Sequence, residues 1–242
     1  MDDPTIDTAS GTEPTHPRAG DPSHASTTDD ALLAAVHDEV IDYGVRRATA
    51  TSIAKRAGVS RMTVYRRGGG VKQLVLDALS REFDTLLRQA LVDGAATATA
   101  TTRARKAGEH GADAGGIPTT RDRLAAAVVL GVRALAGSTL VHALLRHDPD
   151  LLVPYLVDRH GHSQQAFIRD VTPVIAAGIA DGSIRAGDPR IIATVLLQAA
   201  QGFVVSSDIL RRELDAATLE VELEHLIHGY LRPQPTDSQS QP

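Results

Sequence analysis

The sequence predicts an all-α protein, and three observations support that fold class. Apolar residues recur at helical spacing through most of residues 29–231. No segment shows sustained alternation of apolar and polar residues, which is the pattern of a half-buried strand. Glycine and proline stand where helices are expected to end or begin, as at Gly44, Gly182 and Pro189.

The composition restricts the chemistry available to the chain. Its 242 residues include no Cys, which excludes disulfides, thiolate metal ligands and a Cys nucleophile. The N-terminus has no basic stretch followed by an apolar run, and the apolar segment 191–205 is interrupted by Gln198, Gln201 and Gly202. We therefore expect neither a signal peptide nor a membrane span, and a cytoplasmic location.

Charge is distributed unevenly along the chain, although the net charge is only −5. Residues 1–30 hold seven acidic side chains against Arg18 alone, whereas residues 43–76 hold eight cations and no acid. Such a basic stretch is either a solvated face or a surface for an anionic partner, of which a phosphate backbone is the commonest. The eight cations are Arg46, Arg47, Lys55, Arg56, Arg61, Arg66, Arg67 and Lys72.

The apolar pattern divides the chain into five parts. Residues 1–28 and 233–242 are polar segments that we expect to be disordered tails. Residues 29–92 carry two long helical stripes, the second ending near Gly94, with shorter elements between them. Residues 93–120 are dominated by Ala, Thr and Gly and are predicted to be a flexible loop or linker.

The fifth part, residues 121–232, is predicted to be helical over most of its length. Helices are expected over residues 121–136, 139–147, 150–181, 189–211 and 215–231. Pro154 and Pro173 are expected to kink or interrupt the third of these helices.

Residues 49–67 have the pattern of a helix-turn-helix. Thr49 is placed to cap a short helix whose Ile53 and Ala54 face inward, and Gly58 supplies a tight turn. Ser60 is placed to cap a second short helix anchored by Val64. The remaining side chains of that helix project outward, as those of a DNA recognition helix do: Arg61, Met62, Thr63, Tyr65, Arg66 and Arg67.

This segment resembles the TetR family of bacterial regulators, whose DNA-binding end carries the pattern T-x-x-x-I-A-x-x-A-G-V-S-x-x-T-[VL]-Y. The matching positions are Thr49, Ile53, Ala54, Ala57, Gly58, Val59, Ser60, Thr63, Val64 and Tyr65. With its flanking helices the resemblance covers residues 29–92, which it identifies as a DNA-binding domain. It implies phosphate contacts from Thr49 or Thr51, Thr63, Tyr65 and Arg67, and base-edge readout by Arg61 and Met62.

The expected DNA-binding set also includes Ser60, Arg66 and Lys72. The chain departs from the family here, because Gly68, Gly69 and Gly70 replace the usual aromatic residue and helix cap and displace the following Lys by one position, to Lys72. The backbone amides at that helix start can still hold a phosphate. Altered or reduced DNA binding is therefore left open.

For residues 121–232 the resemblance implies a larger helical domain that binds an effector and forms a homodimer through residues 189–231. The fold class is then an N-terminal three-helix bundle with a helix-turn-helix plus this C-terminal domain. The expected effector is an unknown small molecule, apolar or amphipathic. His142, Arg146, Tyr155 and Arg169 are polar groups among apolar helices that can either orient it or lie on the surface. No cofactor or metal is expected.

Two other classes of function fit the sequence less well. An enzyme is not favoured, because no HExxH motif is present and residues 161–165 lack the closing Gly of a nucleophile elbow. Glu222, His225 and His228 share a helix face, which an exposed polar surface explains as well as a metal site does. An architectural or antitoxin-like DNA binder would not need so long a C-terminal helical region. The favoured function is a ligand-responsive repressor that binds a near-palindromic operator as a dimer.

Overall fold

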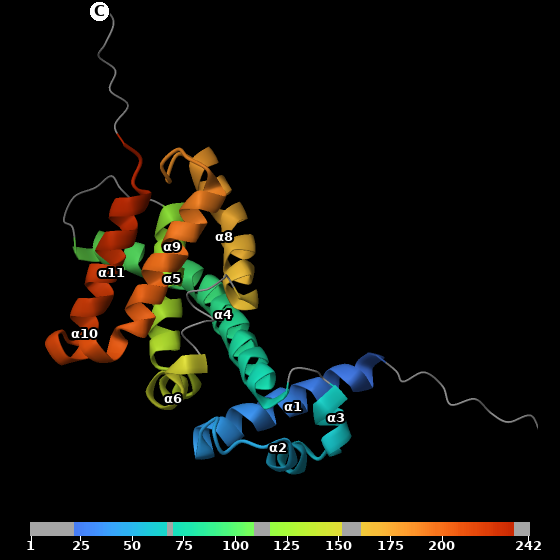
Figure 1. Ribbon diagram of the computed structural model, residues 1–242. Coiled ribbons are helices and arrows are strands. Elements are labelled where there is room, and N and C mark those ends of the chain that lie inside the picture. Colours follow the sequence, from blue (N-terminus) through green and yellow to red (C-terminus); the bar gives the residue numbers. More distant parts are fainter. Residues whose placement is uncertain (1–21, 67–69, 109–116, 152–160, 235–242) are drawn as a thin grey trace, which may run out of the picture.

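The computed structural model describes residues 22–66, 70–108, 117–151 and 161–234, and these form helices without any strand. The predicted all-α class is thereby confirmed. Figure 1 shows α1, α2 and α3 gathered at one end of the molecule and α5, α8, α9 and α11 at the other. The helices are α1 (Pro22–Tyr43), α2 (Ala50–Ala57), α3 (Arg61–Arg66), α4 (Gly70–Gly108), α5 (Thr120–Ala136), α6 (Thr139–His147), α8 (His162–Ala180), α9 (Pro189–Val205), α10 (Ser207–Glu213) and α11 (Ala216–Leu231).

The N-terminal bundle is built on the buried face of α1. Leu32, Val36 and Val40 recur every four residues and are fully buried against α2 and the start of α4. The helix ends where Gly44 adopts a left-handed conformation, with φ of 77°. It begins at Pro22, so the prediction that residues 1–28 are a disordered tail is wrong for residues 22–28, while residues 1–21 lie outside the described part.

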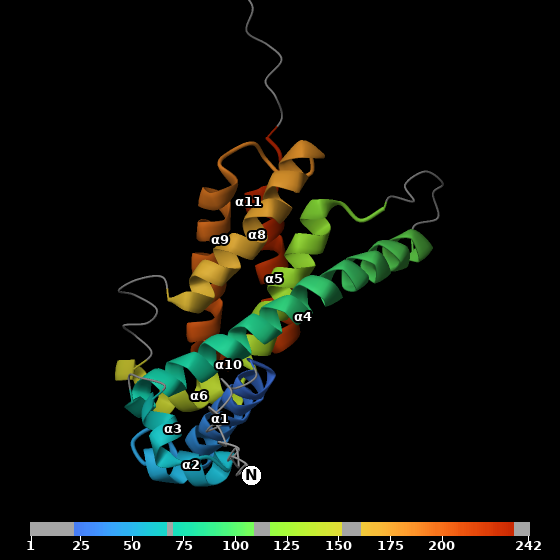
Figure 2. The ribbon, with the colours of Figure 1, turned by 90° about the vertical axis from the view of Figure 1, so that its right-hand side faces the viewer.

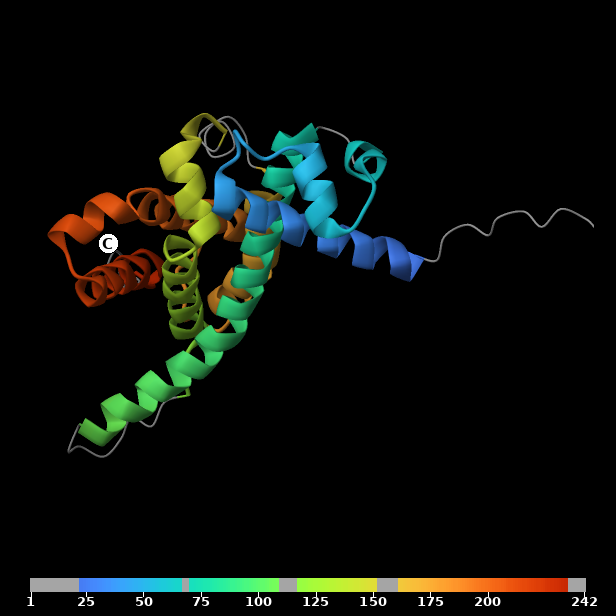
Figure 3. The ribbon, with the colours of Figure 1, turned by 90° about the horizontal axis from the view of Figure 1, so that it is seen from below.

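Helix α4 runs unbroken from Gly70 to Gly108, so the linker predicted over residues 93–120 is wrong for residues 93–108. The expected stop at Gly94 is instead a point of close packing, because a Cβ there would lie 2.7 Å from the backbone nitrogen of Ala127. Gly94 therefore allows the close contact between α4 and α5 and does not form a turn. Ala98 is buried one turn further along. Figures 2 and 3 show α4 continuing beyond the other helices as an arm.

The rest of the predicted linker also differs from expectation. Thr119 caps α5, and Thr120 is already helical and buried. Residues 109–116 lie outside the described part of the chain, so the predicted loop is left with no more than a short segment between α4 and α5.

Helix α5 is central to the C-terminal body, where it contacts α4, α8, α9 and α11. The predicted helices over 121–136, 139–147 and 215–231 match α5, α6 and α11 within one residue. The helix predicted over 189–211 is divided at Ser206, where α9 and α10 meet at a bend of 66°. Helix α8 continues through Pro173 as one element, and Pro154 lies outside the described residues.

A carboxylate ties the end of α8 to the start of α5. The Thr120 hydroxyl donates to Asp181 at 2.6 Å, and the Ser183 backbone amide donates to the same carboxylate at 2.8 Å. Hydrogen bonds from Ser183 and then Thr120 lower the pKa of Asp181 to about 2. The group therefore stays ionised, and the tie stays intact, well into the acid range.

No single helix among those described is long and apolar enough to cross a membrane, although two bent pairs, α5 with α6 and α9 with α10, reach that threshold when each pair is taken together.

The packing of α4 on α5 yields a matched pair of glycine substitutions. We expect Gly94→Ala to destabilise the protein by about 1–3 kcal/mol, because the new methyl group would overlap the backbone of Ala127. Gly131→Ala, in the same helix pair, places its methyl 3.6 Å from Ala90 and should be neutral or stabilising by up to about 1 kcal/mol. Chemical denaturation followed by circular dichroism measures both, and equal effects would contradict the close contact at Gly94.

Candidate nucleic-acid interface and ligand pocket

Helix α2 is fixed at both ends by its own sequence. The Thr49 hydroxyl accepts the Ser52 amide at 3.1 Å, and the Ser52 hydroxyl oxygen accepts the Thr49 amide at the same distance, which completes a capping box. Gly58 ends the helix with φ of 67° and donates to backbone carbonyls of its last turn. The predicted cap and turn are confirmed, and Ile53 anchors the helix with a fully buried side chain.

Helix α3 has one buried anchor and an exposed outer surface. Ser60 accepts the Thr63 amide at 3.1 Å, as predicted, and Val64 is almost fully buried. Met62 and Tyr65 are 67% and 59% exposed. Both side chains are accessible on the outer surface of α3. The side chains of this surface therefore stand ready to meet a partner.

The other predicted DNA-binding residues lie on or beside this surface, with one exception. Arg61 and Arg66 are exposed on α3, and the Arg61 guanidinium donates to the Thr51 hydroxyl at 3.4 Å. Lys72 is exposed in the first turn of α4. Arg67 lies outside the described residues. The hydroxyls of Thr49, Ser60 and Thr63 are occupied in the caps of α2 and α3.

Arg56 has a role that the charge pattern did not reveal. Its guanidinium donates to Asp42 at 2.7 Å and lies 3.1 Å from Glu39 of α1, whose side chain is only 6% exposed. The hydrogen bond to Asp42 raises the pKa of Arg56, so the guanidinium stays charged at every ordinary pH. One cation of the basic stretch therefore holds α2 against α1 rather than facing outward.

A second internal tie joins the N-terminal bundle to the C-terminal body. Asp148, which caps the end of α6, accepts the Val45 amide at 3.3 Å and lies 3.5 Å from the guanidinium of Arg46. The Asp148 side chain is 11% exposed, whereas that of Arg46 is 81% exposed. The loop before α2 is thus attached to α6 through a buried carboxylate.

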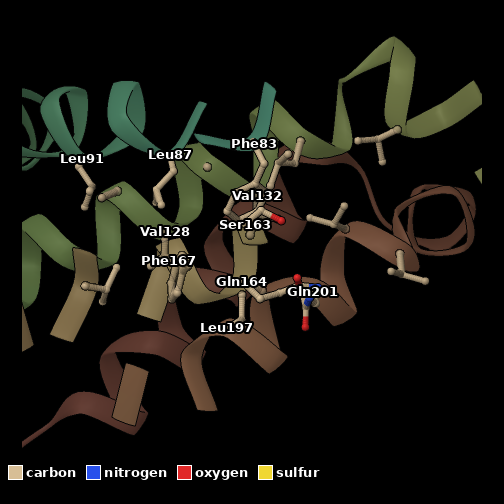
Figure 4. Close-up of a pocket in the computed structure, with 18 of the residues that line it drawn as sticks. Phe83, Leu87, Leu91, Val128, Val132, Ser163, Gln164, Phe167, Leu197 and Gln201 are labelled. Atoms are coloured by element: carbon tan, nitrogen blue, oxygen red, sulfur yellow. The ribbon is translucent and has the colours of Figure 1, made fainter. Parts of the chain in front are cut away.

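A pocket lies between α4, α5, α6, α8 and α9 (Figure 4). It encloses about 950 Å³ of empty space, a figure that includes solvent at its open mouth. Helix α4 contributes Leu79, Phe83, Leu87 and Leu91 to its wall, and α6 contributes Val141 and Leu145. The four-residue spacing on α4 was visible in the sequence, but such a stripe reads equally well as ordinary core.

The predicted ligand-orienting residues do not line this pocket. His142 and Arg146 on α6 pair with Asp208, at 3.3 and 3.4 Å, and Arg169 pairs with the adjacent Asp170 at 2.7 Å. Tyr155 lies outside the described residues. The side chains of the three described residues therefore meet carboxylates and are absent from the lining of this pocket. The pocket's own polar side chains are Ser163, Gln164 and Gln201.

Within the described ranges, no group of three or more His, Asp or Glu side chains is arranged to hold a metal ion. His228 of the face singled out in the sequence lies 3.7 Å from Glu224 and 3.9 Å from Asp122.

Comparison with known proteins assigns the chain to a family. No protein-family model matches it. It is 32% identical, over 200 residues, to uncharacterised HTH-type transcriptional regulators of Mycobacterium bovis and Mycobacterium tuberculosis, which spans 83% of this chain and 92% of each relative. This chain belongs to the HTH-type transcriptional regulators, and its fold is that of the TetR family. It is accordingly a DNA-binding transcription regulator.

Solved TetR-family structures share the fold. The repressor AlkX from Dietzia matches 84% of this chain and 94% of its own length, at 19% identity and a TM-score of 0.56. The regulator FadR from Bacillus subtilis, solved in complex with stearoyl-CoA, matches 84% of this chain and 99% of its own length, at 15% identity and a TM-score of 0.53. This regulator therefore has the TetR architecture of a helix-turn-helix end joined to a helical body.

The two roles of arginine in the helix-turn-helix can be separated by substitution. Arg56→Ala should lower the thermal unfolding midpoint, because Glu39 would remain buried without its cation. Arg66→Ala is the control: Arg66 is exposed, so stability should not change while DNA binding weakens. Adding Glu39→Gln to Arg56→Ala should recover part of the loss, since it removes the stranded charge. Equal midpoints for the two single variants would contradict the assigned anchor.

Proposed function

We propose that this regulator is a ligand-responsive repressor that, without ligand, binds a near-palindromic operator as a homodimer in the cytoplasm. A small apolar or amphipathic molecule in the pocket would favour a state that no longer fits the operator. The observation that carries the proposal is the shared helix α4, which follows the recognition helix and also forms one wall of the pocket.

The proposed DNA contacts follow from the exposed surface of α3. Arg61 is assigned to base-edge readout, because its planar guanidinium matches the acceptors of guanine in the major groove, and Met62 lies beside it. Thr49, Thr51, Ser60, Thr63 and Tyr65 are assigned to phosphates, together with Arg66, Arg67 and Lys72. The Ser60 and Thr63 hydroxyls share one hydrogen bond, which leaves one of their two protons to donate to a phosphate, so capping and phosphate contact are compatible on α3.

A second copy of the chain is the proposed partner of α9, α10 and α11. These helices expose large aliphatic side chains on the side of the molecule remote from α1–α3 (Figure 1). A monomer rarely leaves so many apolar groups in water, and burying them between two copies would be favourable. The exposed residues are Ile191, Val195, Val205, Ile209, Val221 and Leu226.

Two connections lead from the pocket to the DNA-binding end. Helix α4 reaches both, and α6 lines the pocket with Val141 and Leu145 before Asp148 at its end holds the loop preceding α2. A ligand that displaces α6 would therefore move that loop and the orientation of α2 and α3. The stearoyl-CoA complex of FadR supports the proposal, because the same architecture there accommodates a ligand with a long acyl chain.

Operator binding is tested with the DNA that flanks the gene of this regulator. In gel-shift titration we expect tight, sequence-dependent binding of two chains per site, with the ratio verified by light scattering. Arg61→Ala should weaken binding about ten- to hundredfold, because a bidentate base contact contributes roughly 1–3 kcal/mol. Arg212→Ala, which removes an exposed cation on α10, is the control. Weak, sequence-independent DNA binding that Arg61→Ala leaves unchanged would contradict the operator proposal.

The coupling through α6 is tested with Asp148→Ala. Dodecanol serves as an amphipathic probe, and the measured quantity is the operator Kd with and without it. For the wild-type protein, dodecanol should raise the operator Kd by roughly 5–150-fold, the usual range of allosteric coupling. Asp148→Ala should reduce that ratio while dodecanol still binds, because the tie to Val45 and Arg46 is lost. Asp150→Ala, at an exposed neighbouring position, should leave it unchanged. An unaltered ratio in Asp148→Ala would show that α6 does not carry the signal.

A further inference from the structure

The wall of the pocket is uncharged along all of its described residues. Apart from the polar side chains of Ser163, Gln164 and Gln201, these residues are aliphatic, Phe or Gly. The basic side chains of α6 and α8 that the sequence singled out contact carboxylates: His142 and Arg146 contact Asp208, and Arg169 contacts Asp170. A ligand in the pocket therefore meets no countercharge from this wall.

An ionised ligand group would be strongly disfavoured in such surroundings. Transfer of a carboxylate or ammonium out of water into an apolar site is costly unless a partner charge and hydrogen bonds compensate it. A neutral hydroxyl, amide or ester needs only one or two hydrogen bonds to offset its desolvation. The pocket can supply these bonds, since Gln164 and Gln201 each carry an amide with donor and acceptor groups and Ser163 carries a hydroxyl.

The position of these groups indicates how a ligand would lie. Ser163 and Gln164 are in the first turn of α8 and are almost completely buried, while Gln201 is half-buried on α9. In Figure 4, Leu91 is the labelled residue farthest from Gln201, and Leu87 and Val128 lie between them. The polar end of a ligand would therefore approach α8 and α9, with its apolar part along α4.

The pocket is also long in one direction. The α4 residues in its wall span positions 79 to 91, which at 1.5 Å per residue is roughly 18 Å of helix. Leu79, Phe83, Leu87 and Leu91 thus form a continuous apolar rail. An elongated hydrocarbon fits this rail better than a compact molecule does.

We infer that the effector is an elongated, uncharged lipophile with one neutral hydrogen-bonding group, held by Gln201 together with Ser163 and Gln164. This inference rests on the proposed function and defines its ligand class: fatty alcohols, amides and esters are accepted, whereas free carboxylates and amines of the same length are rejected. Charge, rather than chain length, is the selected property.

The test compares three probes of equal chain length on the full wild-type chain. Dodecanol, dodecanoate and dodecylammonium are titrated at pH 8 by isothermal calorimetry in the absence of DNA. Dodecanol should bind at least about tenfold more tightly than either ion, because only the ions lose hydration without gaining a partner charge. Dodecanoate or dodecylammonium binding as tightly as dodecanol would overturn the inference, and so would the absence of binding by all three.

A substitution should reverse the selectivity. Gln201→Arg places a permanent cation in the pocket wall, so dodecanoate should gain at least about tenfold in affinity and become preferred over dodecanol. Gln165→Arg is the matched control, because Gln165 is exposed on α8 and does not line the pocket; it should keep the wild-type preference. Circular dichroism verifies that both variants fold. Unchanged selectivity in a folded Gln201→Arg protein would contradict the assignment of Gln201.

Failure of this inference and failure of the proposed function give different results. If dodecanol binds selectively but leaves the operator complex intact, the ligand class stands and the repressor mechanism is wrong. If dodecanoate binds best and releases the operator, the repressor mechanism stands and the ligand class is wrong.

Discussion

The close packing of α4 on α5 is the contact on which the rest of the molecule depends. At Gly94 the two backbones approach so closely that no side chain fits between them. This contact fixes the far half of α4 in the C-terminal body, while its near half completes the bundle formed with α1 and α2. Because α4 is one continuous helix, the position of the body determines the position of its first turn, which follows the recognition helix α3 in the chain.

Charged groups divide into two classes by what they face. Glu39 and Asp148 are largely buried carboxylates, and each holds an arginine or a backbone amide of the helix-turn-helix region in place. The cations on α3 have no such partner in the described structure and lie open to solvent. The described residues that line the pocket include no charged side chain of either class. Electrostatics thus orients the DNA-binding end and leaves ligand recognition to shape and neutral hydrogen bonds.

Local signals in the sequence were sufficient for much of the fold. Thr49, Gly58 and Ser60 act within a few residues of themselves, so the helix-turn-helix and its caps were predictable, as were the bounds of α5, α6 and α11. Gly94 misled because its role is set by Ala127, a residue remote in sequence. Composition likewise gave no warning that α1 begins at Pro22.

The DNA-binding surface could be predicted from the sequence, whereas the ligand pocket could not. The exposed face of α3 follows from helical periodicity around Val64, so Arg61, Met62 and Tyr65 could be placed outside in advance. The pocket could not, because leucines that line a cavity and leucines that fill a core have the same spacing. Polar residues in apolar helices suggested ligand contacts, but His142 and Arg146 share a carboxylate partner, Asp208, that only the tertiary structure reveals.

The continuity of α4 also sets a rule for exchanging parts between regulators of this architecture. A chimera that joins this DNA-binding end to another body has to be cut inside a helix, and the junction must preserve rotational phase. One inserted residue turns everything beyond it by about 100° around the axis. The rail from Leu79 to Leu91 would then face away from α5. Seven inserted residues restore the direction to within about 20°, although they lengthen the rod by roughly 10 Å. Modular evolution at this point is therefore constrained to whole turns.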